Sequence, residues 1–382
     1  MAPEDKRIPV TLLTGFLGAG KTTLLNHLIR DPEAGRIAVI MNEFGDVGLD
    51  HDLIEELTEE VVLLPSGCLC CAVLGDLAKT FEALLDKRDA GTVDFDRIVI
   101  ETSGIADPGP IVHSMVTERL IAQAFRLDGV VTLADAATGM KTLDQQFEAV
   151  HQVAIADLLI LSKTDLVDPF DLSRFENRLE GLNASARRIH ADHGKVPVGA
   201  LFGLSAMREG VTSSDVDSWL GLSSEPAKPD PLAGLSGFAA KPATQATFSP
   251  TPSTAHDRHD HKIASASIEV TDPIPADVFD FWLDTLITLK GPDILRMKGI
   301  LHVEGLQYPF VFHGVQHIFD TPVPLKSWSG DDTTSRVVVI ARNIEEPELK
   351  RSLDVLLMRP EEGAAGESLP GGMMVDTASK QV

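Results

Sequence analysis

Short apolar runs alternate with helical patterns over the first part of the chain, up to about Leu220. Continuous runs of Val, Ile and Leu are typical of strands buried on both faces of a sheet, and they lie at residues 8–13, 37–41, 61–64, 97–101, 129–133 and 158–161. Helices are predicted between them, at residues 21–30, 73–87, 110–124 and 145–154. The alternation predicts an α/β domain with a mostly parallel sheet covered by helices on both faces.

The pattern changes after about Leu220. Residues 223–262 are rich in Pro, Ser, Ala, Gly and Thr, which predicts a flexible linker that ends in the histidine-containing run 256–261. Apolar periodicity then returns and predicts strands at 263–270, 300–303, 308–312 and 336–340, with helices at 275–289 and 346–358. The expected organisation is an α/β domain at 1–222, a linker at 223–262, a small α+β domain at 263–358 and a disordered tail at 359–382.

Composition narrows the possible partners. The 382 residues provide for two domains, and a net charge of −24 repels phosphate backbones and anionic lipid, so neither nucleic acid nor a membrane is an expected partner. No apolar stretch has the length of a bilayer span, and residues 1–7 lack the pattern of a signal peptide. We therefore expect a cytoplasmic protein. Its three cysteines, all between Cys68 and Cys71, do not form a disulfide framework.

The strongest motif is a glycine-rich loop between the first strand and the first helix. The sequence from Gly15 to Thr22 has the P-loop spacing G-x-x-x-x-G-K-T, whose backbone N–H groups bind phosphate at a helix N-terminus. Lys21 is expected on the β- and γ-phosphates and the Thr22 hydroxyl on Mg²⁺. The predicted nucleotide-binding residues here are Gly15, Gly18, Ala19, Gly20, Lys21, Thr22 and Thr23.

Two further strand ends carry acidic residues. Glu101 ends the strand at 97–101 and precedes Thr102-Ser103-Gly104, which suits a second Mg²⁺ ligand followed by a segment that senses the γ-phosphate. Asn42-Glu43-Phe44-Gly45-Asp46 follows the strand at 37–41, where Asp46 could help to hold Mg²⁺ or orient water and Glu43 could bind another metal. We predict Lys21, Asp46 and Glu101 as the catalytic residues. The simpler interpretations, an ordinary strand end and a solvated loop, remain open.

The segment Ser162-Lys163-Thr164-Asp165 follows the strand at 158–161 and predicts the base that is bound. A carboxylate at Asp165 can accept from guanine N1–H and the amino group, whereas it would meet an acceptor at adenine N1, and the Lys163 stem can pack over the ring. Ser162 replaces the Asn of the usual Asn-Lys-x-Asp motif, so one side-chain contact is expected to be shortened or lost. The segment 204–206 is the expected second base-contacting loop, and a plain turn is the alternative for 162–165.

Cys68, Cys70 and Cys71 form a Cys-x-Cys-Cys motif between a strand and a helix. Thiolates suit Zn²⁺, Cu⁺ or Co²⁺, and an incomplete thiolate set favours transient binding over a structural zinc site. Buried small side chains and a redox pair are the alternatives. The histidines in 256–261 could collect metal or be incidental, and for His313 and His317 packing or surface positions are expected.

Taken together, these motifs resemble the CobW-like GTPases, which include zinc-regulated metalloprotein activators and nitrile hydratase activators. The segments that carry the resemblance are 15–22, 42–46, 67–71, 101–104, 162–165 and 295–300. The resemblance implies a GTPase domain followed by a CobW-type C-terminal domain. It also implies Cys68, Cys70 and Cys71 as metal thiols with Glu43 as an additional ligand, and GTP with Mg²⁺ drawing the thiolates together.

The resulting hypothesis is a GTP-hydrolysing metallochaperone that passes a metal, with zinc the first choice, to a client metalloprotein. GTP and metal would bind as coupled sites, and the chain would act as a monomer or a homodimer. Co²⁺ for cobalamin synthesis or nitrile hydratase is one alternative. A metal buffer without useful turnover and a small-molecule kinase are the others, and the kinase predicts no role for the cysteines.

Overall fold

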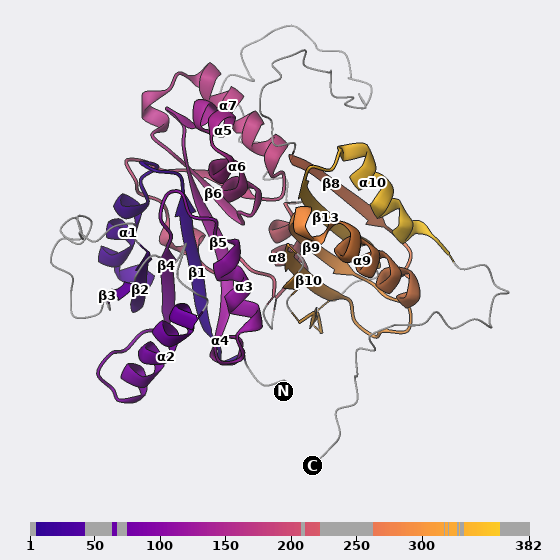
Figure 1. The fold of residues 1–382 in the computed structure, drawn as a ribbon, viewed down its shortest axis with the longest axis horizontal. Coiled ribbons are helices and arrows are strands. Elements are labelled where there is room, and N and C mark those ends of the chain that lie inside the picture. Colours follow the sequence, from indigo (N-terminus) through magenta and orange to yellow (C-terminus); the bar gives the residue numbers. More distant parts are fainter. Residues whose placement is uncertain are drawn as a thin grey trace, which may run out of the picture.

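The computed structural model describes residues 5–42, 63–66, 75–207, 211–221 and 263–359, apart from 317, 320, 327 and 329–331. The chain forms two sheet-containing parts that lie side by side, one from the indigo-to-magenta half of the sequence and one from the orange-to-yellow half (Figure 1). Short helix α8 (Ser213–Leu220) lies between them.

The first part contains a seven-stranded sheet in the order β3-β2-β4-β1-β5-β6-β7, and every neighbouring pair is parallel. The strands are β1 (Ile8–Gly15), β2 (Ile37–Asn42), β3 (Leu63–Ser66), β4 (Arg97–Glu101), β5 (Phe125–Asp135), β6 (Leu158–Ser162) and β7 (Arg187–His190). The helices are α1 (Lys21–Arg30), α2 (Gly75–Asp89), α3 (Gly109–Thr117), α4 (Arg119–Ala124), α5 (Gly139–Gln145), α6 (Phe147–Ala154) and α7 (Pro169–Leu182). The α/β prediction is confirmed.

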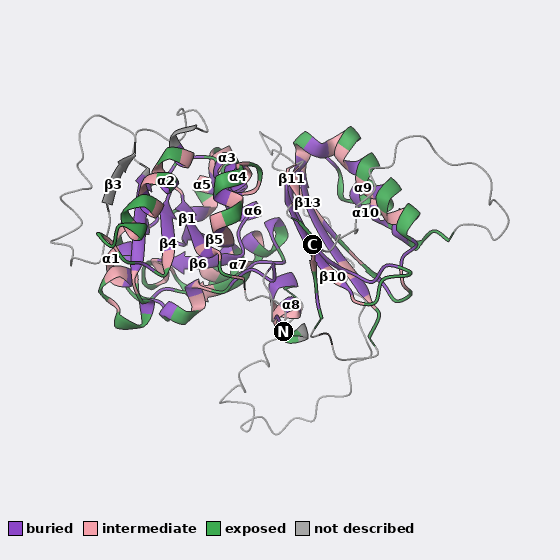
Figure 2. Ribbon diagram, turned by 90° about the horizontal axis from the view of Figure 1, so that it is seen from below, coloured by how far each residue is buried: buried purple, intermediate pink, exposed green. Residues whose placement is uncertain are grey.

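Successive residues of the inner strands point to opposite faces of this sheet, and both faces are buried (Figure 2). In β4, Ile98 and Ile100 pack with helices α2, α3 and α4, whereas Val99 packs with α1 on the other face. Because neither face meets water, each strand needs apolar residues at consecutive positions, which is the pattern that made these strands visible in the sequence.

Some elements differ from the sequence prediction. The helix expected at 110–124 is two helices, because Glu118 adopts an extended conformation (φ −76°, ψ 111°) between α3 and α4. Helices α5 and α7 and strand β7 were not predicted. The start of α7 did carry a signal, since Asp168 caps the N–H groups of Phe170 and Asp171 and is followed by Pro169.

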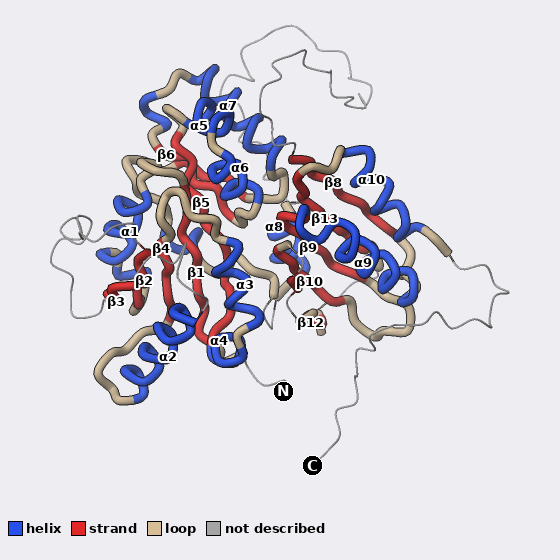
Figure 3. The backbone as a smooth tube through the Cα atoms, viewed as in Figure 1, coloured by secondary structure: helices blue, strands red, loops and turns tan. Residues whose placement is uncertain are grey.

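The second part is a six-stranded antiparallel sheet in the order β11-β10-β9-β13-β8, with β12 paired to β10. Its strands are β8 (Ile263–Val270), β9 (Ile294–Leu301), β10 (Phe310–Val315), β11 (Ile318–Phe319), β12 (Val323–Pro324) and β13 (Ser335–Arg342). Helices α9 (Ala276–Lys290) and α10 (Glu346–Leu353) cover one face (Figure 3). The predicted start of β9 at residue 300 was wrong, because two buried basic residues interrupt its apolar pattern.

The other face of the second sheet packs against the first domain. Ile300 and Val311 contact Val216 and Trp219 of α8 in one buried cluster. A bulge in β9 shifts the register to β13, which pairs Ile340 with Arg296 but Ala341 with Ile294. The extra residue, Leu295, joins the core cluster that contains the first sheet, so both Leu295 and Arg296 serve the contact between domains.

A buried ion cluster lies at this contact. Asp157, which directly precedes β6, is 2.5 Å from Arg296 Nη2 and 2.9 Å from Lys298 Nζ, and the exposed fractions of these side chains are 4%, 1% and 1%. Burial opposes ionisation of Asp157, but the two cations outweigh it and hold the pKa of that carboxyl well below its usual range. Burial lowers the pKa of Lys298 to about 8, because Asp157 offsets only part of the desolvation.

We expect Asp157→Asn to destabilise the protein by about 3–5 kcal/mol, because it leaves two buried cations without a counter-charge. Asparagine keeps the shape of the side chain, so packing is not the cause. Urea unfolding followed by circular dichroism measures the change.

Asp96→Asn is the matched control. Asp96 is paired with Arg36 at 2.6 Å, but both side chains are more than 40% exposed, so its loss should cost below about 1 kcal/mol. Equal losses of stability in the two variants would contradict the assignment of Asp157 as the main electrostatic contact between the domains.

Candidate functional site

The candidate site lies at the carboxyl ends of four parallel strands, β1, β4, β5 and β6. In the order β4-β1-β5-β6 these strands are adjacent, so the segments that follow them meet at one edge of the sheet. Among the predicted site residues, those in the described ranges all lie at the last residue of β1, β4 or β6 or in the segment that follows.

The glycine-rich loop forms a closed turn between β1 and α1. Gly15 has a φ of 141°, and a Cβ at this position would be 2.6 Å from the Leu133 carbonyl oxygen, so no other residue fits against β5. Lys21 Nζ donates to the Gly15 carbonyl at 2.8 Å and lies across the loop. The N-terminus of α1 begins at Lys21 directly beneath the loop, which is the geometry of an anion site.

The end of β4 is joined to this loop by side-chain hydrogen bonds. The Thr22 hydroxyl donates to Glu101 Oε1 at 3.2 Å, although the two residues are 79 positions apart. Next to it, the Thr102 hydroxyl donates to Thr14 Oγ1 at 2.8 Å. A hydroxyl and a carboxylate oxygen side by side are ligands of the kind that Mg²⁺ prefers, so Thr22 and Glu101 fit the predicted Mg²⁺ position.

A cavity of about 230 Å³ adjoins the loop on its β6 side. Its lining includes residues of the loop and α1, of the segment after β6 and of the segment after β7: Ala19, Gly20, Thr23, Ser162, Lys163, Asp165, His193 and Gly194. The structure therefore brings the predicted base-binding residues next to the predicted phosphate-binding residues. The cavity continues directly from the phosphate loop, as a bound nucleotide requires.

Ser162 retains a contact with the glycine-rich loop. Its hydroxyl donates to the Ala19 carbonyl at 2.7 Å, and the bond is buried. The short side chain reaches the loop backbone because β6 ends close to it. The prediction that the replacement of Asn by Ser shortens or removes a side-chain contact stays a prediction.

Asp135, at the end of β5, is a site residue that the sequence analysis missed. Its Oδ2 is 2.7 Å from Lys163 Nζ, while its Oδ1 accepts from the Ala137 N–H. Lys163 has a left-handed backbone (φ 56°), which is uncommon for a residue other than glycine. Its ion pair with Asp135 helps to hold the side chain beside the cavity. The signal that could have found Asp135 is the one that identified Glu101, a carboxylate directly after a buried apolar strand.

The expected second base-contacting loop at 204–206 does not line the cavity. Leu204 instead packs against Gly129, where a Cβ would be 2.6 Å from the leucine Cβ, and Ser205 accepts from the Met207 N–H. The segment after β7 takes that place, through His193 and Gly194. The expectation was wrong because a short segment without a motif can be placed only by knowing which strand lies next to β6.

The predicted transition-metal ligands Glu43, Cys68, Cys70 and Cys71, together with Asp46, lie outside the described residues, as does the run 256–261. Across the described ranges, no group of three or more His, Cys, Asp or Glu side chains could hold a metal ion. His313 is buried, and its ring lies 6.2 Å from that of Trp219, which confirms packing as its role.

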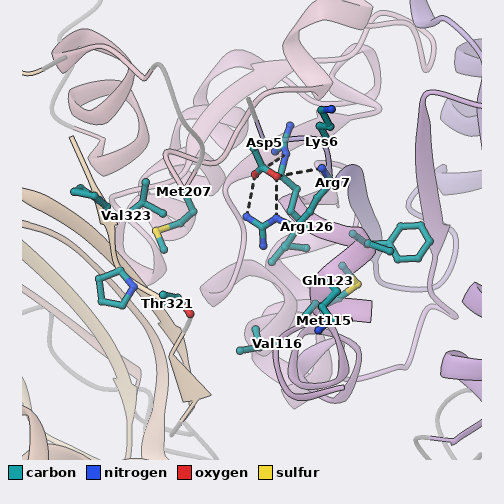
Figure 4. A pocket seen from close by; sticks show the side chains of 16 residues that line it. Asp5, Lys6, Arg7, Met115, Val116, Gln123, Arg126, Met207, Thr321 and Val323 are labelled. Carbon is teal, nitrogen blue, oxygen red and sulfur yellow. Dashed lines mark hydrogen bonds and ion pairs between the residues drawn. The ribbon is translucent and has the colours of Figure 1, made fainter. Parts of the chain in front are cut away.

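A larger cavity, of about 860 Å³, lies between the two domains at the opposite end of the first sheet (Figure 4). Arg7, which precedes β1, and Arg126, near the start of β5, both contact Asp5 there, and Thr321 and Val323 approach from the second domain. None of the predicted site residues lines it.

Within the part of the chain that the structure describes, no helix combines the length and the apolarity needed to cross a bilayer.

The parallel sheet, the glycine-rich loop and the adjoining base-sized cavity define a P-loop nucleotide-binding protein with a second, antiparallel-sheet domain. The chain belongs to the CobW family. Residues 9–190 match the family model described as the CobW/HypB/UreG nucleotide-binding domain, and residues 263–357 match the cobalamin synthesis protein cobW C-terminal domain.

Two of three named relatives match nearly the whole chain, and the third matches half of it. The zinc chaperone YjiA of Escherichia coli is 32% identical over 343 residues, which cover 90% of this chain and 96% of that protein. The zinc chaperone CobW of Pseudomonas aeruginosa is 31% identical and covers 92% of each chain. The zinc-regulated GTPase metalloprotein activator 1 of Schizosaccharomyces pombe is 39% identical over 50% of this chain and 47% of its own length.

A solved structure has the same two-domain fold. The crystal structure of the Zn(II)-bound YjiA GTPase from E. coli superposes with a TM-score of 0.64 and 28% sequence identity, covering 92% of this chain and 99% of that one. The likeness therefore includes both sheets and is not confined to the P-loop domain.

Proposed function

We propose that this protein is a GTP-hydrolysing metallochaperone that binds a transition metal and delivers it to a client metalloprotein. The observation that carries the proposal is the continuous site formed by the phosphate loop, the Thr22–Glu101 pair and the cavity beside Asp165. Its relatives named as zinc chaperones support the metal as cargo. We place it in the cytoplasm, where thiols remain reduced, as a monomer or a homodimer.

In this proposal the nucleotide lies along the carboxyl edge of the first sheet. The loop from Gly15 to Thr23 binds the phosphates, and Lys21 balances their charge. Thr22 and Glu101 would hold Mg²⁺, which would supply positive charge to neutralise the phosphates. Asp46 orients the attacking water. Since the described residues supply Lys21 but no arginine beside the loop, we expect slow intrinsic turnover.

The base lies in the cavity of about 230 Å³, with Asp165 accepting from guanine N1–H and the amino group. We expect Asp165→Asn to weaken GTP binding at least about 100-fold, because two hydrogen bonds to a charged group are lost. The same variant should gain affinity for XTP, since xanthine presents an acceptor where guanine has its amino group and an amide can donate to it. Isothermal titration with GTP, XTP and ATP measures both changes.

Asp192→Asn serves as the control for charge. Asp192 lies beside His193, but its side chain is 94% exposed and does not line the cavity, so its nucleotide preference should be that of the wild type. Unchanged GTP affinity in the Asp165 variant would remove the basis for guanine selection at this cavity.

The cargo site is proposed on Cys68, Cys70 and Cys71, with Glu43 as an additional ligand. Zn²⁺ is the expected metal, because thiolates with one oxygen ligand suit it and because zinc is in the names of the relatives, and Co²⁺ is the alternative. Metal and GTP then bind as coupled sites, so each raises the affinity for the other by the same factor. Loss of the γ-phosphate reverses that gain and releases the metal to the client.

Titration of Zn²⁺ and Co²⁺ in the presence of Mg²⁺ tests this coupling. We expect metal affinity to rise at least about tenfold with a non-hydrolysable GTP analogue, compared with GDP or no nucleotide, which corresponds to the usual size of a coupling free energy. Cys70→Ser should abolish that rise and leave affinity for the GTP analogue in metal-free buffer within about twofold, because no thiol belongs to the proposed phosphate and base contacts.

Tight metal binding that ignores the nucleotide would favour a metal buffer instead. Phosphate transfer to an acceptor other than water, with no effect of Cys70→Ser, would favour a kinase. Either result would contradict the proposed function.

A further inference from the structure

Helix α6 connects the nucleotide site to the second domain. Gln152, in its last turn, is 1% exposed, and its Nε2 donates to the carbonyl oxygens of Gly104 and Ala106 at 3.2 and 3.1 Å. These two residues belong to the segment that follows Glu101. A single buried amide therefore fixes the backbone of the segment next to the predicted Mg²⁺ position.

The segment held by Gln152 touches the phosphate loop. A Cβ on Gly104 would be 2.6 Å from the Leu17 backbone nitrogen, so the two backbones are in direct contact. At the other end of the segment, Asp107 is 3.1 Å from His151 Nδ1 and accepts from the Gly109 N–H at the start of α3. A shift of α6 would thus be transmitted to residues 104–107 and from there to the loop around the γ-phosphate.

The same helix contacts the second domain at both of its ends. At its first residue, the Arg342 guanidinium of β13 lies 5.8 Å from the centre of the Phe147 ring, and that ring stacks on His151 at 5.7 Å. Three residues after the end of the helix, Asp157 is held by Arg296 and Lys298 of β9. The second domain therefore contacts α6 directly and also holds the short segment between α6 and β6.

Further hydrogen bonds make α6 a stiff unit. Asn183 Nδ2 donates to the carbonyls of Val153, Ala154 and Ala156 at 2.9 to 3.0 Å and so satisfies the C-terminal end of the helix. The Thr132 hydroxyl of β5 donates to the Gln152 carbonyl at 2.9 Å. Because its end is capped and its last turn is tied to the sheet, we expect α6 to transmit a displacement rather than absorb it by bending.

We propose that Gln152 is a positioning residue for nucleotide turnover, and that the second domain controls that turnover through Arg342 and α6. The inference rests on the proposed function, because it concerns the same nucleotide site. Gln152 sets the place of residues 104–106 without touching the nucleotide. A client that binds the second domain and shifts it then changes the rate of GTP hydrolysis, and the nucleotide changes the affinity for that client by the same coupling.

The test uses the full chain with Gln152→Met, Arg342→Met and the double variant. Methionine has nearly the length of glutamine and of the aliphatic stem of arginine, and it has no hydrogen-bond donor. We expect Gln152→Met to lower the single-turnover rate of GTP hydrolysis about tenfold or more while GDP affinity stays within about twofold, because only the γ-phosphate side of the site is misplaced. Arg342→Met should lower the rate about threefold, since it removes a single contact from α6.

The double variant distinguishes a shared path from two separate effects. If Arg342 acts through α6 and Gln152, the double variant is no slower than Gln152→Met alone. Arg336→Met is the matched control. Arg336 lies on the same strand, and its described ion pairs are with Glu269 and Asp332 of its own domain. The Arg336→Met variant should therefore hydrolyse GTP at the wild-type rate.

A wild-type rate of GTP hydrolysis in Gln152→Met would overturn the inference. So would a double variant whose loss of rate is the product of the two single losses. Equal losses of affinity for GDP and for the GTP analogue in Gln152→Met would also overturn it. If Gln152→Met does not fold, Arg342→Met against Arg336→Met decides the question alone, because both arginines are partly exposed. A wild-type protein that binds no guanine nucleotide would instead remove the proposed function, and the two failures are therefore distinct.

Discussion

The arrangement of the two domains depends on one buried carboxylate. Asp157 lies between Arg296 and Lys298, and all three side chains are almost wholly removed from water. Each of these charges would be costly to bury alone, so the cluster is stable only when both domains are in contact. The charges also set the register of that contact, because a shift of β9 by one residue would turn Arg296 and Lys298 to the opposite face of their sheet.

The nucleotide site is built by hydrogen bonds between segments that follow different strands. Thr22 meets Glu101, Ser162 meets the Ala19 carbonyl, and Lys163 meets Asp135. Parallel strands bring these segments to one edge of the sheet, and the short bonds then fix their distances before any ligand binds. Such preorganisation lowers the cost of ordering the site when a nucleotide binds.

The buried ion cluster and the nucleotide site are both connected to α6, which relates the two-domain architecture to the proposed function. Asp157 follows α6, and the buried amide of Gln152 in that helix holds the segment beside the phosphate loop. In the proposed function, client binding and the state of the nucleotide must be coupled to each other. A second domain fixed to α6 offers a physical route between the two, because closely packed elements transmit displacements.

The sequence by itself determined the parallel sheet, the phosphate loop and the membership of Glu101, Lys163 and Asp165 in one site, because strand patterns and motif spacing are local. Only the tertiary structure decided the partner of Lys163, the place of His193 at the cavity beside the phosphate loop and the buried ion cluster around Asp157. Asp157 and Arg296 are 139 positions apart, and a lone charged residue in an apolar run does not reveal its partner. Contacts of that kind exist only once the sheets have packed, since burial is what makes the pairing of charges necessary.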